Sequence, residues 1–521
     1  MNQTLSKFLA LTMAVLIVFT LAACQGGTTT TTTGSTTGAT TTKATTTGAT
    51  TTTAPTTTAP RDPVTITSLH SEVTVPVEQP SIVLKVRELT NINWEPMLVG
   101  PADYQTKLNS LIASRDLPDF FSFGLVNGLE YKDSGMLVEL TSLLADHAPD
   151  ILENRGEFLA SGLNTADEIW GIPTPPGYHN ALAVRTDWLT NVGLDMPDTL
   201  DEFYEVLKAF TENDPNKSGK KDTLGLAANI LYPTMWQPVF GAYDIAYKLP
   251  VMVDGVVTSH LLHPDYLKVI EFFRKLYQEG LMEPDFASMP QMSTLEKLWN
   301  GTYGVMGFTP VGTTNNWMPG RYVEDPPPTF GWAVIRGPEG KGGFNKSYAT
   351  GYYGLASTCE EPEEAIKLAN FLGSKEGDQL LYFGIEDKHF KWVNEAEGKY
   401  EYLAPYNDSA TQRADGGFIF WSLFKRWNDN AEIRTMNLTT REGLQLSIDN
   451  PVTDAYIYQQ PAISADLGST LGDIENEALA NLVVTTGNVE EEYAAYVQRW
   501  LNEGGETWQQ QATEIYKMEN P

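Results

Sequence analysis

The segment from Asp214 to Asp222 has the residue types and the spacing of a calcium-binding loop. Gly219 stands at position 6, the carbonyl of Lys220 is available at position 7, and oxygen-bearing side chains stand at positions 1, 3, 5 and 9: Asp214, Asn216, Ser218 and Asp222. A hard divalent cation needs several oxygens that converge on one point, and a glycine relieves the sharp bend of such a loop. Position 12 is Gly225 instead of Glu. The pattern predicts a structural Ca²⁺ site, and the alternative is a polar loop in which Asp and Asn make turns.

A second residue with chemistry of its own is Cys24. It follows an almost wholly apolar run from Phe8 to Ala23, which is short for a membrane span and typical of a secretory signal peptide. The run ends in Leu-Ala-Ala-Cys, which resembles a bacterial lipobox. We therefore expect residues 1–23 to be a cleaved signal peptide and the Cys24 thiol to carry a lipid such as palmitate, although an ordinary signal peptide with a chance Cys has the same pattern. Cys359 is then left without a disulfide partner.

The sequence offers little that points to catalysis. It contains no Gly-x-Ser-x-Gly, His-Glu-x-x-His or phosphate-binding P-loop pattern. The histidines are scattered along the chain: His70, His147, His179, His260, His263 and His389. With 66 Asp and Glu residues, some carboxyl pair will meet the spacing of a glycoside hydrolase by chance. We therefore expect a protein that is not an enzyme.

The composition narrows the choice of partners. The formal net charge is -31, which argues against nucleic acid and against non-specific binding to anionic lipid. Residues 24–60 combine Cys24 with a segment rich in Thr that lacks apolar periodicity, so we expect a disordered tether there. The 12 Trp and 23 Tyr residues would serve a core, and they would also serve a sugar-binding cleft.

After Arg61, short apolar strands alternate with amphipathic helices, which predicts an α/β fold. We expect strands at 64–68, from Phe120, and at 181–185. Helices are expected around 104–115, after a capping box formed by Thr199 and Glu202, and at 264–279 and 362–372.

The order of these segments resembles the extracellular solute-binding proteins of carbohydrate ABC importers. This family includes maltose-, multiple-sugar- and alginate-oligosaccharide-binding proteins, and the likeness is strongest to its long lipoprotein branch in Gram-positive bacteria. The resemblance covers most of residues 61–521 and rests on an ordered set of segments: 111–119, 135–140, 171–173, 185–189, 214–225, 279–281, 300–306 and 384–386.

The resemblance implies a two-lobed, type II periplasmic-binding-protein-like fold with a hinge between the lobes. The expected first lobe spans 61–178 plus 309–373, and the second spans 179–308 plus 374–521. The implied function is capture of an oligosaccharide between the lobes and its delivery to the transmembrane subunits of an ABC permease. We further expect a monomer that is lipid-anchored at the extracellular face of the cytoplasmic membrane. Alginate-binding relatives have the same loop type as 214–222, which implies the five Ca²⁺ ligands named above.

A sugar offers apolar C–H faces and many hydroxyl groups, so its cleft should combine aromatic rings with planar polar side chains. The resemblance projects these candidates toward the cleft: Ser122, Phe123, Asn127, Tyr232, Trp236, Trp317, Tyr352, Tyr353, Trp421 and Trp427. Of these we favour Trp236, Tyr352 and Trp421 as platforms for the sugar, and core packing is the alternative for each. Two other functions stay open: the same fold with a non-sugar solute such as a peptide, and a glycan-binding surface protein or sensor without transport.

Overall fold

The computed structural model describes residues 62–520, apart from 73–75, 178, 315–320, 350 and 428. By its internal contacts the chain divides into Met1–Arg61 and Asp62–Pro521. The predicted signal peptide, lipidated Cys24 and tether lie outside the described residues, and so does Trp317. None of the described helices is both long enough and apolar enough to cross a membrane.

Two central sheets organise the described chain. The first has the strand order β2-β1-β3-β11-β4, and its strands are β1 (Val64–Ser71), β2 (Ile92–Val99), β3 (Phe120–Gly124), β4 (Ile172–Pro173) and β11 (Gly351–Leu355). The second has the order β10-β5-β9-β6, and its strands are β5 (Ala181–Arg185), β6 (Leu224–Leu226), β9 (Tyr303–Phe308) and β10 (Phe330–Ala333). Two separate hairpins are formed by β7 (Pro250–Val253) with β8 (Val256–Ser259) and by β12 (Phe390–Asn394) with β13 (Lys399–Tyr402).

Helices connect and cover these strands. Up to β5 they are α1 (Ser81–Thr90), α2 (Tyr104–Ser114), α3 (Leu125–Asp133), α4 (Thr141–His147) and α5 (Pro149–Leu159). Between β5 and β11 they are α6 (Thr186–Val192), α7 (Leu200–Glu212), α8 (Pro233–Gly241), the 3₁₀ turn η1 (His260–Leu262), α9 (Tyr266–Gln278), α10 (Gln291–Trp299) and α11 (Pro310–Thr313).

After β11 the chain is mostly helical. The elements are α12 (Pro362–Leu372), α13 (Lys375–Phe383), the 3₁₀ turn η2 (Glu395–Glu397), α14 (Ser409–Ala414), α15 (Trp421–Phe424), α16 (Ala431–Thr435), α17 (Leu438–Asp449), α18 (Ser464–Val484), α19 (Val489–Trp500), the π-helical segment η3 (Leu501–Gly505) and α20 (Glu506–Glu519).

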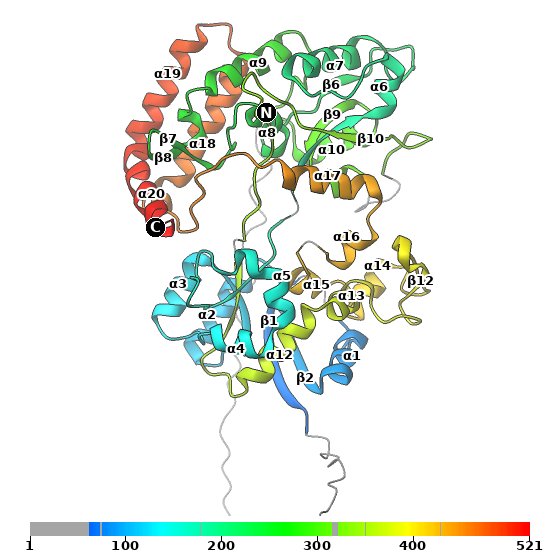
Figure 1. The fold of residues 1–521 in the computed structure, drawn as a ribbon, viewed down its shortest axis with the longest axis vertical. Coiled ribbons are helices and arrows are strands. Elements are labelled where there is room, and N and C mark those ends of the chain that lie inside the picture. The colour runs from blue at the N-terminus through cyan, green and yellow to red at the C-terminus, as the bar shows by residue number, and fades with distance from the viewer. Residues whose placement is uncertain are drawn as a thin grey trace, which may run out of the picture. The chain divides into compact units, whose positions relative to one another are not determined.

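The two sheets lie in separate lobes, each with its own helices and its own core (Figure 1). Because β1, β2 and β3 are mutually parallel, helices must return the chain between them. The described elements pass between the lobes at three places: from β4 to β5, from β10 to β11 and from α16 to α17. The fold is therefore the two-lobed α/β fold that the sequence predicts.

Several helices and strands begin and end where short sequence patterns predict. The capping box at the start of α7 is present in both directions, with the Thr199 hydroxyl accepting from the Glu202 backbone and the Glu202 carboxylate accepting from the Thr199 backbone. The expected strand at 181–185 and the expected helix at 362–372 coincide with β5 and α12. Helix α9 ends just before Gly280, whose φ of 70° suits a residue without a side chain.

The lobe boundaries differ from the expected ones in two places. Strand β10 was expected in the first lobe, but it pairs antiparallel with β5 in the second sheet. The segment from α13 to α15 was expected in the second lobe, but Leu381, Phe420 and Trp421 are buried in the core of the first sheet. In both cases the reason is packing: Trp332 of β10 donates to the Thr439 carbonyl in α17, while the aromatic run at 418–424 covers β1 and β11 of the first sheet through His70 and Tyr353.

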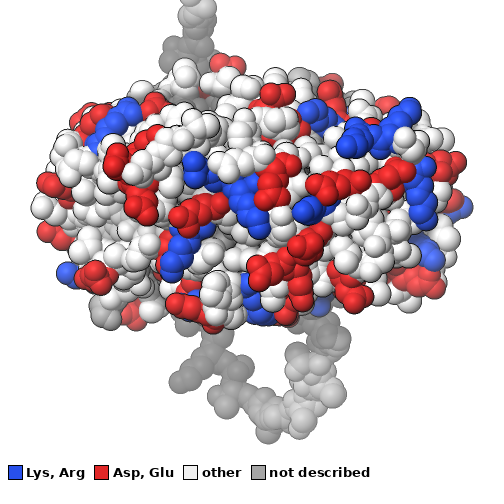
Figure 2. Space-filling view, turned by 90° about the horizontal axis from the view of Figure 1, so that it is seen from above, with Lys and Arg blue, Asp and Glu red and all other residues white. Residues whose placement is uncertain are grey.

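Acidic side chains do not gather in one patch on the face of the molecule that Figure 2 shows. On the face seen from above, Asp and Glu side chains are interspersed with Lys and Arg (Figure 2). Exposed ion pairs of the described chain include Lys391 with Glu401 and Arg499 with Glu503. Each such pair contributes little to stability, so this charge serves solubility more than fold.

Candidate ligand-binding site

A cavity of about 350 Å³ opens at the carboxyl end of β3, where the chain enters α3. Ligands of open α/β sheets commonly bind outside the carboxyl ends of strands. From the first lobe the cavity is lined by Gly124, Leu125, Val126 and Asn127, from the crossing segment by Ala349, and from the segment after α17 by Tyr456, Tyr458 and Gln460. Residues from distant parts of the sequence thus meet at one site between the two lobes.

Alternation along the chain aims the two tyrosines at this cavity. Ala455 and Ile457 are buried against Val257 of β8 and against α20 in a small core cluster. In an extended segment successive side chains point to opposite sides. The burial of 455 and 457 therefore turns Tyr456 and Tyr458 to the other side, where both line the cavity.

The tyrosines belong to a rigid aromatic cluster. Tyr456 stacks on Tyr348 with ring centroids 3.8 Å apart and nearly parallel planes, and it meets Tyr458 edge-on at 5.1 Å. The Tyr348 hydroxyl donates to Asp454 at 2.7 Å, and the Tyr458 backbone N–H donates to Glu519 at 2.9 Å. Burial raises the pKa of Tyr456 to about 12, so its phenol is neutral and can donate a hydrogen bond at physiological pH.

The chemistry of the lining is neutral and amphipathic. The lining residues are apolar, aromatic or amide-bearing, and none of them has an ionisable carboxyl or basic group. Behind the tyrosines stand two carboxylates, Asp454 and Glu519. Tyrosine faces and edges suit C–H surfaces, while the amides of Asn127 and Gln460 can both donate and accept. This arrangement favours a neutral ligand that has hydroxyl groups over an anion.

Five of the predicted ligand residues lie on β3, β11 and the start of α3: Ser122, Phe123, Asn127, Tyr352 and Tyr353. Asn127 lines the cavity, and its amide also donates to Gln105 at 3.1 Å. Phe123 and Tyr352 are buried, with their rings stacked at 6.3 Å. The Tyr352 hydroxyl donates to the Ser161 carbonyl at 2.9 Å and accepts from the Leu163 backbone. Phe123 and Tyr352 therefore form part of the apolar core of the first lobe.

Ser122 and Tyr353 also have protein partners. The Ser122 backbone and hydroxyl each contact the Tyr104 hydroxyl at 2.9 Å. Tyr353 is fully buried and stacks on Phe424 at 5.2 Å. Antiparallel backbone pairing, with Tyr353 opposite Ser122, holds β3 and β11 side by side and positions the nearby loop of the cavity.

Trp236 and Tyr232 lie in the second lobe, at α8. Trp236 has no exposed area, donates its indole N–H to the Asn229 carbonyl at 2.9 Å, and meets Phe273 and Phe286 edge-on. Its ring faces are occupied by protein. Tyr232 is half-buried at the start of α8 and meets Phe308 edge-on at 5.6 Å.

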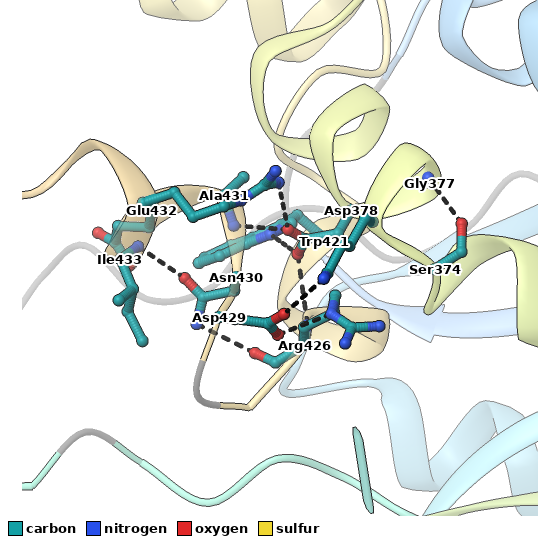
Figure 3. A network of polar contacts seen from close by, with 12 residues as sticks. Ser374, Gly377, Asp378, Trp421, Arg426, Asp429, Asn430, Ala431, Glu432 and Ile433 are labelled. Atoms are coloured by element: carbon teal, nitrogen blue, oxygen red, sulfur yellow. Dashed lines mark hydrogen bonds and ion pairs between the residues drawn. The ribbon is translucent and has the colours of Figure 1, made fainter. Parts of the chain in front are cut away.

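Trp421 lies in a polar network around the buried carboxylate of Asp378 (Figure 3). Asp378 accepts from the Trp421 indole N–H at 2.7 Å, from the Ala431 backbone at 2.5 Å and from Arg434 at 3.3 Å. Burial raises the pKa of Asp378, although these donors counteract the shift. The network ties α13 to the segment that crosses to the second lobe, and it uses the polar edge of Trp421 for that purpose.

Trp427 lies close to another crossing segment. It is mostly buried, with its ring centroid 5.6 Å from that of His179 and 6.2 Å from that of Phe158. Its backbone N–H donates to Asn154 at 2.8 Å. Trp427 therefore packs between α5 and the chain that leaves β4.

The loop at 214–222 folds around its own oxygens. The Asp214 carboxylate accepts from the backbones of Ser218 and Gly219 at 2.9 and 3.0 Å. Asp222 accepts from the Asn216 amide at 3.0 Å and from the Ser218 hydroxyl at 2.9 Å. These hydrogen bonds hold the pKa of Asp222 below its usual value. Among the described residues no group of three or more His, Cys, Asp or Glu is arranged to hold a metal, and this loop contributes only two carboxylates.

Cys359 has the character of a structural residue. Burial and the nearby Asp119 carboxylate raise the pKa of its thiol to about 12, so it is protonated and unreactive at neutral pH.

Sequence reasoning missed the aromatic side of the cavity. Tyr456, Tyr458 and Gln460 follow α17, far along the chain from β3. The one local signal was the alternation of Ala455 and Ile457 with the two tyrosines. That pattern shows that the tyrosines share a side, but it does not show which part of the chain they face.

Comparison with curated proteins finds two relatives in Bacillus subtilis (strain 168). The chain is 26% identical over 459 residues to Lipoprotein LipO, which covers 82% of this chain and 86% of that protein. It is 25% identical over 462 residues to the polygalacturonan/rhamnogalacturonan-binding protein YtcQ, which covers 84% of this chain and 88% of that protein.

Solved structures share the fold at lower identity. A human-milk-oligosaccharide-binding, ABC-transporter-associated solute-binding protein of Bifidobacterium longum infantis matches with a TM-score of 0.65 and 18% identity, over 88% of this chain and 99% of that one. An EF-hand mutant of the Streptococcus pneumoniae ABC-transporter substrate-binding protein FusA, in complex with fructo-nystose, matches with a TM-score of 0.58 and 17% identity, over 87% and 99%.

The family is established by a match that spans more than half of the chain. Residues 81–379 match the family described as bacterial extracellular solute-binding protein. This range begins at α1 and ends within α13. It includes the strands of both central sheets apart from β1, the cavity loop after β3 and the loop at 214–222. The chain is therefore a member of the bacterial extracellular solute-binding protein family.

Proposed function

We propose that this protein captures a neutral oligosaccharide between its two lobes and delivers it to the permease of an ABC importer. The observation that carries the proposal is the cavity after β3, in which Tyr456 and Tyr458 present aromatic surface opposite the amide of Asn127. Stacked and edge-on tyrosines suit the C–H faces of a sugar, while amides satisfy its hydroxyl groups. The volume of about 350 Å³ lies within the range of small-ligand sites.

The relatives support a sugar as the solute. Their names and titles describe binding of polygalacturonan or rhamnogalacturonan, of human milk oligosaccharides and of a fructan. The first of these is an acidic glycan, whereas the cavity here has no basic lining residue and has Asp454 and Glu519 behind it. A uronate would meet repulsion at this site, so a neutral chain is the better fit.

Membership of this family also supports a proposal about the oligomeric state of the protein and its attachment to the membrane. The protein acts as a monomer without catalysis of its own, and the Cys24 lipid holds it at the extracellular face of the cytoplasmic membrane. The Thr-rich segment up to residue 60 gives the folded part reach. Metabolic labelling with a palmitate analogue tests the anchor, and incorporation into a Cys24→Ala variant at the wild-type level would contradict it.

We propose that Ca²⁺ binds the loop at 214–222 in a structural role. The donor set fits a hard cation: carboxylates of Asp214 and Asp222, the Asn216 amide oxygen, the Ser218 hydroxyl and the Lys220 carbonyl. The hydrogen bonds within the loop bring Asn216 and Ser218 within about 3 Å of Asp222, and a bound cation would replace these contacts. The loop follows α7 on the side of the second lobe, so its effect is on stability.

The test is isothermal titration of the purified protein with oligosaccharides and peptides. The glycan panel includes neutral fructans and milk-type oligosaccharides as well as oligogalacturonates. A neutral glycan should bind saturably, and Tyr456→Ala should weaken it about tenfold or more, because the stacking surface is lost. Tyr456→Phe is the matched control, since it keeps the ring and should retain most of the affinity. Binding of peptides alone, or equal affinity in Tyr456→Ala, would contradict the assignment.

A further inference from the structure

A second cavity, of about 140 Å³, lies in the second lobe and shares no lining residue with the cavity after β3. One wall is a single face of α18, because Gly468, Leu471, Gly472 and Glu475 are spaced three and four residues apart. Trp500 and Trp508 form a second wall. The remaining lining residues belong to the β7–β8 hairpin and the chain on either side of it: Lys248, Leu249, Pro250, Ser259 and His260.

An irregular helix places the two tryptophans. The π-helical segment Leu501–Gly505 joins α19 to α20, and Gly504 within it has a φ of 117°. A side chain at Gly505 would collide with the Trp500 ring. The result is a pair of indoles at 72° with centroids 6.1 Å apart. Glu503 and Gly504 have non-helical backbone angles, so the chain kinks between α19 and α20.

At the polar end of the cavity, Lys248 and Glu475 form an ion pair, and the Ser259 hydroxyl also donates to Glu475. Glu475 accepts from the Ser259 hydroxyl at 2.6 Å and from Lys248 at 3.1 Å. The side chains of Lys248 and Glu475 are only 22% and 15% exposed, and the pair carries no net charge. A ligand that bridges such a pair needs groups that donate and accept at neighbouring positions, as vicinal hydroxyl groups do.

Two buried polar atoms on lining residues have no partner. The indole N–H of Trp500 and Nε2 of His260 are both without a hydrogen bond, although each residue is about 1% exposed. A buried polar atom without a hydrogen bond is unfavourable, and such groups are few in folded proteins. A hydroxyl-bearing molecule in the cavity would meet this need.

We infer that this cavity is a second, independent binding site for a single neutral polyhydroxylated ring, the size of one monosaccharide. The half-buried indole of Trp508 offers surface for its C–H face. The Lys248–Glu475 pair contacts its hydroxyl groups, and the indole N–H of Trp500 donates to one of them. The small volume excludes a chain of rings. An amino acid would have to separate Lys248 from Glu475 to use its own charges, whereas a polyol leaves the pair intact.

Substitutions at Gly472 give a direct test. A Cβ added at Gly472 meets no atom within 4 Å, so both Gly472→Ala and Gly472→Leu should fold, and each gains helix propensity over glycine. Only the leucine is long enough to fill the cavity. Gly472→Ala is therefore the matched control for the change in the helix.

The measurement is titration of the purified protein with D-glucose, D-galactose and myo-inositol, followed by ¹H–¹⁵N spectra of the indole N–H groups. The Trp500 signal is assigned by its loss in Trp500→Phe. At least one probe should bind saturably and shift the Trp500 signal in the wild type and in Gly472→Ala. Gly472→Leu should weaken this binding about tenfold or more.

Binding at this second cavity can be tested separately from binding at the cavity after β3. Tyr456→Ala should keep the monosaccharide response and lose the oligosaccharide, while Gly472→Leu should do the reverse. The inference is overturned if none of the three probes binds, if Gly472→Leu binds them as the wild type does, or if glycine or glutamine competes more strongly than the sugars.

Discussion

At the scale of single residues, Asp415 connects three segments of the first lobe. One carboxylate oxygen accepts from the Ser81 backbone at 2.7 Å, and the other accepts from the Ser81 hydroxyl at 2.7 Å and from Lys388 at 2.9 Å. His389 contacts the same oxygen at 3.1 Å. Because Nδ1 of His389 accepts from the Ile385 backbone, Nε2 carries the proton and donates to Asp415.

This cluster predicts a pH-dependent contribution to stability. Burial alone would raise the pKa of Asp415, but the donors from Ser81, Lys388 and His389 hold it well below its usual value. A lowered carboxyl pKa contributes stability above the unfolded value, near 3.9, and this contribution is lost as the pH falls through the folded pKa. Asp415→Asn should therefore be less stable at pH 7 by about 1 kcal/mol, and the difference should shrink toward pH 3.

Urea denaturation of wild type and variant across this pH range checks the prediction. Asp387→Asn, at an exposed carboxylate next to Lys388, is the control. A difference between wild type and Asp415→Asn that stays constant down to pH 3 would show that the charge of Asp415 does not matter.

Trp421 gives a prediction that separates structure from ligand binding. Its ring is 4% exposed, and its indole N–H donates to the buried Asp378 carboxylate at 2.7 Å. Trp421→Phe removes this donor, so the variant should be less stable by about 1–3 kcal/mol, while oligosaccharide affinity stays at the wild-type value. Trp392→Phe, at a half-buried indole of the same lobe, is the control. A loss of affinity without a loss of stability would restore the earlier expectation that Trp421 is a sugar platform.

Residue roles were the hardest part to predict from the sequence. Trp236 and Trp421 have the aromatic surface that a sugar needs, yet one is enclosed by Phe273 and Phe286 and the other is bound to Asp378. From the sequence alone, an isolated aromatic residue in the core cannot be distinguished from one that contacts a sugar. Asn127 lines the cavity, and its place just beyond a buried strand is a local feature that the sequence shows; its role in ligand binding stays a prediction.

At the scale of elements, signals within a few residues located helices and strands. The capping box of α7 and the strand β5 depend on neighbours along the chain. The lobe to which β10 belongs depends instead on its pairing with β5. Likewise, the segment from α13 to α15 joins the first lobe through long-range packing of Phe420 and Trp421. Such contacts leave no local trace in the sequence.

The loop at 214–222 should make the stability of the protein depend on Ca²⁺. If Ca²⁺ fills the ring of oxygens between α7 and β6, it should raise the melting temperature, because a ligand at a hundredfold excess over its dissociation constant adds about 2.7 kcal/mol. The double variant Asp214→Ala, Asp222→Ala should lose this rise. Asp195→Ala, at an exposed carboxylate outside the loop, should keep it. The same rise in the double variant, measured by calorimetry with Ca²⁺ and with chelator, would contradict the calcium proposal.

At the scale of the whole molecule, the cavity after β3 draws on both lobes. Asn127 belongs to the first lobe, and Tyr456 and Tyr458 are attached to the second through Ala455 and Ile457. A ligand there contacts both lobes at once, so binding is linked to the arrangement in which they meet. The family resemblance predicts this principle and names Asn127, whereas Tyr456 and Tyr458 emerged only with the structure.

The distribution of charge predicts how ligand binding depends on salt. The chain has a net charge of -31, but the cavity lining is neutral. Binding of a neutral oligosaccharide should therefore be nearly independent of ionic strength between about 0.01 M and about 1 M salt, over which the Debye length falls from about 30 Å to about 3 Å. An acidic oligosaccharide would be repelled by Asp454, Glu519 and the overall charge, and this repulsion would weaken as salt increases. Titrations of one neutral glycan and one oligogalacturonate at both salt concentrations distinguish the two. A neutral glycan whose affinity rises or falls strongly with salt would place charged side chains in the contact surface and would require a different site.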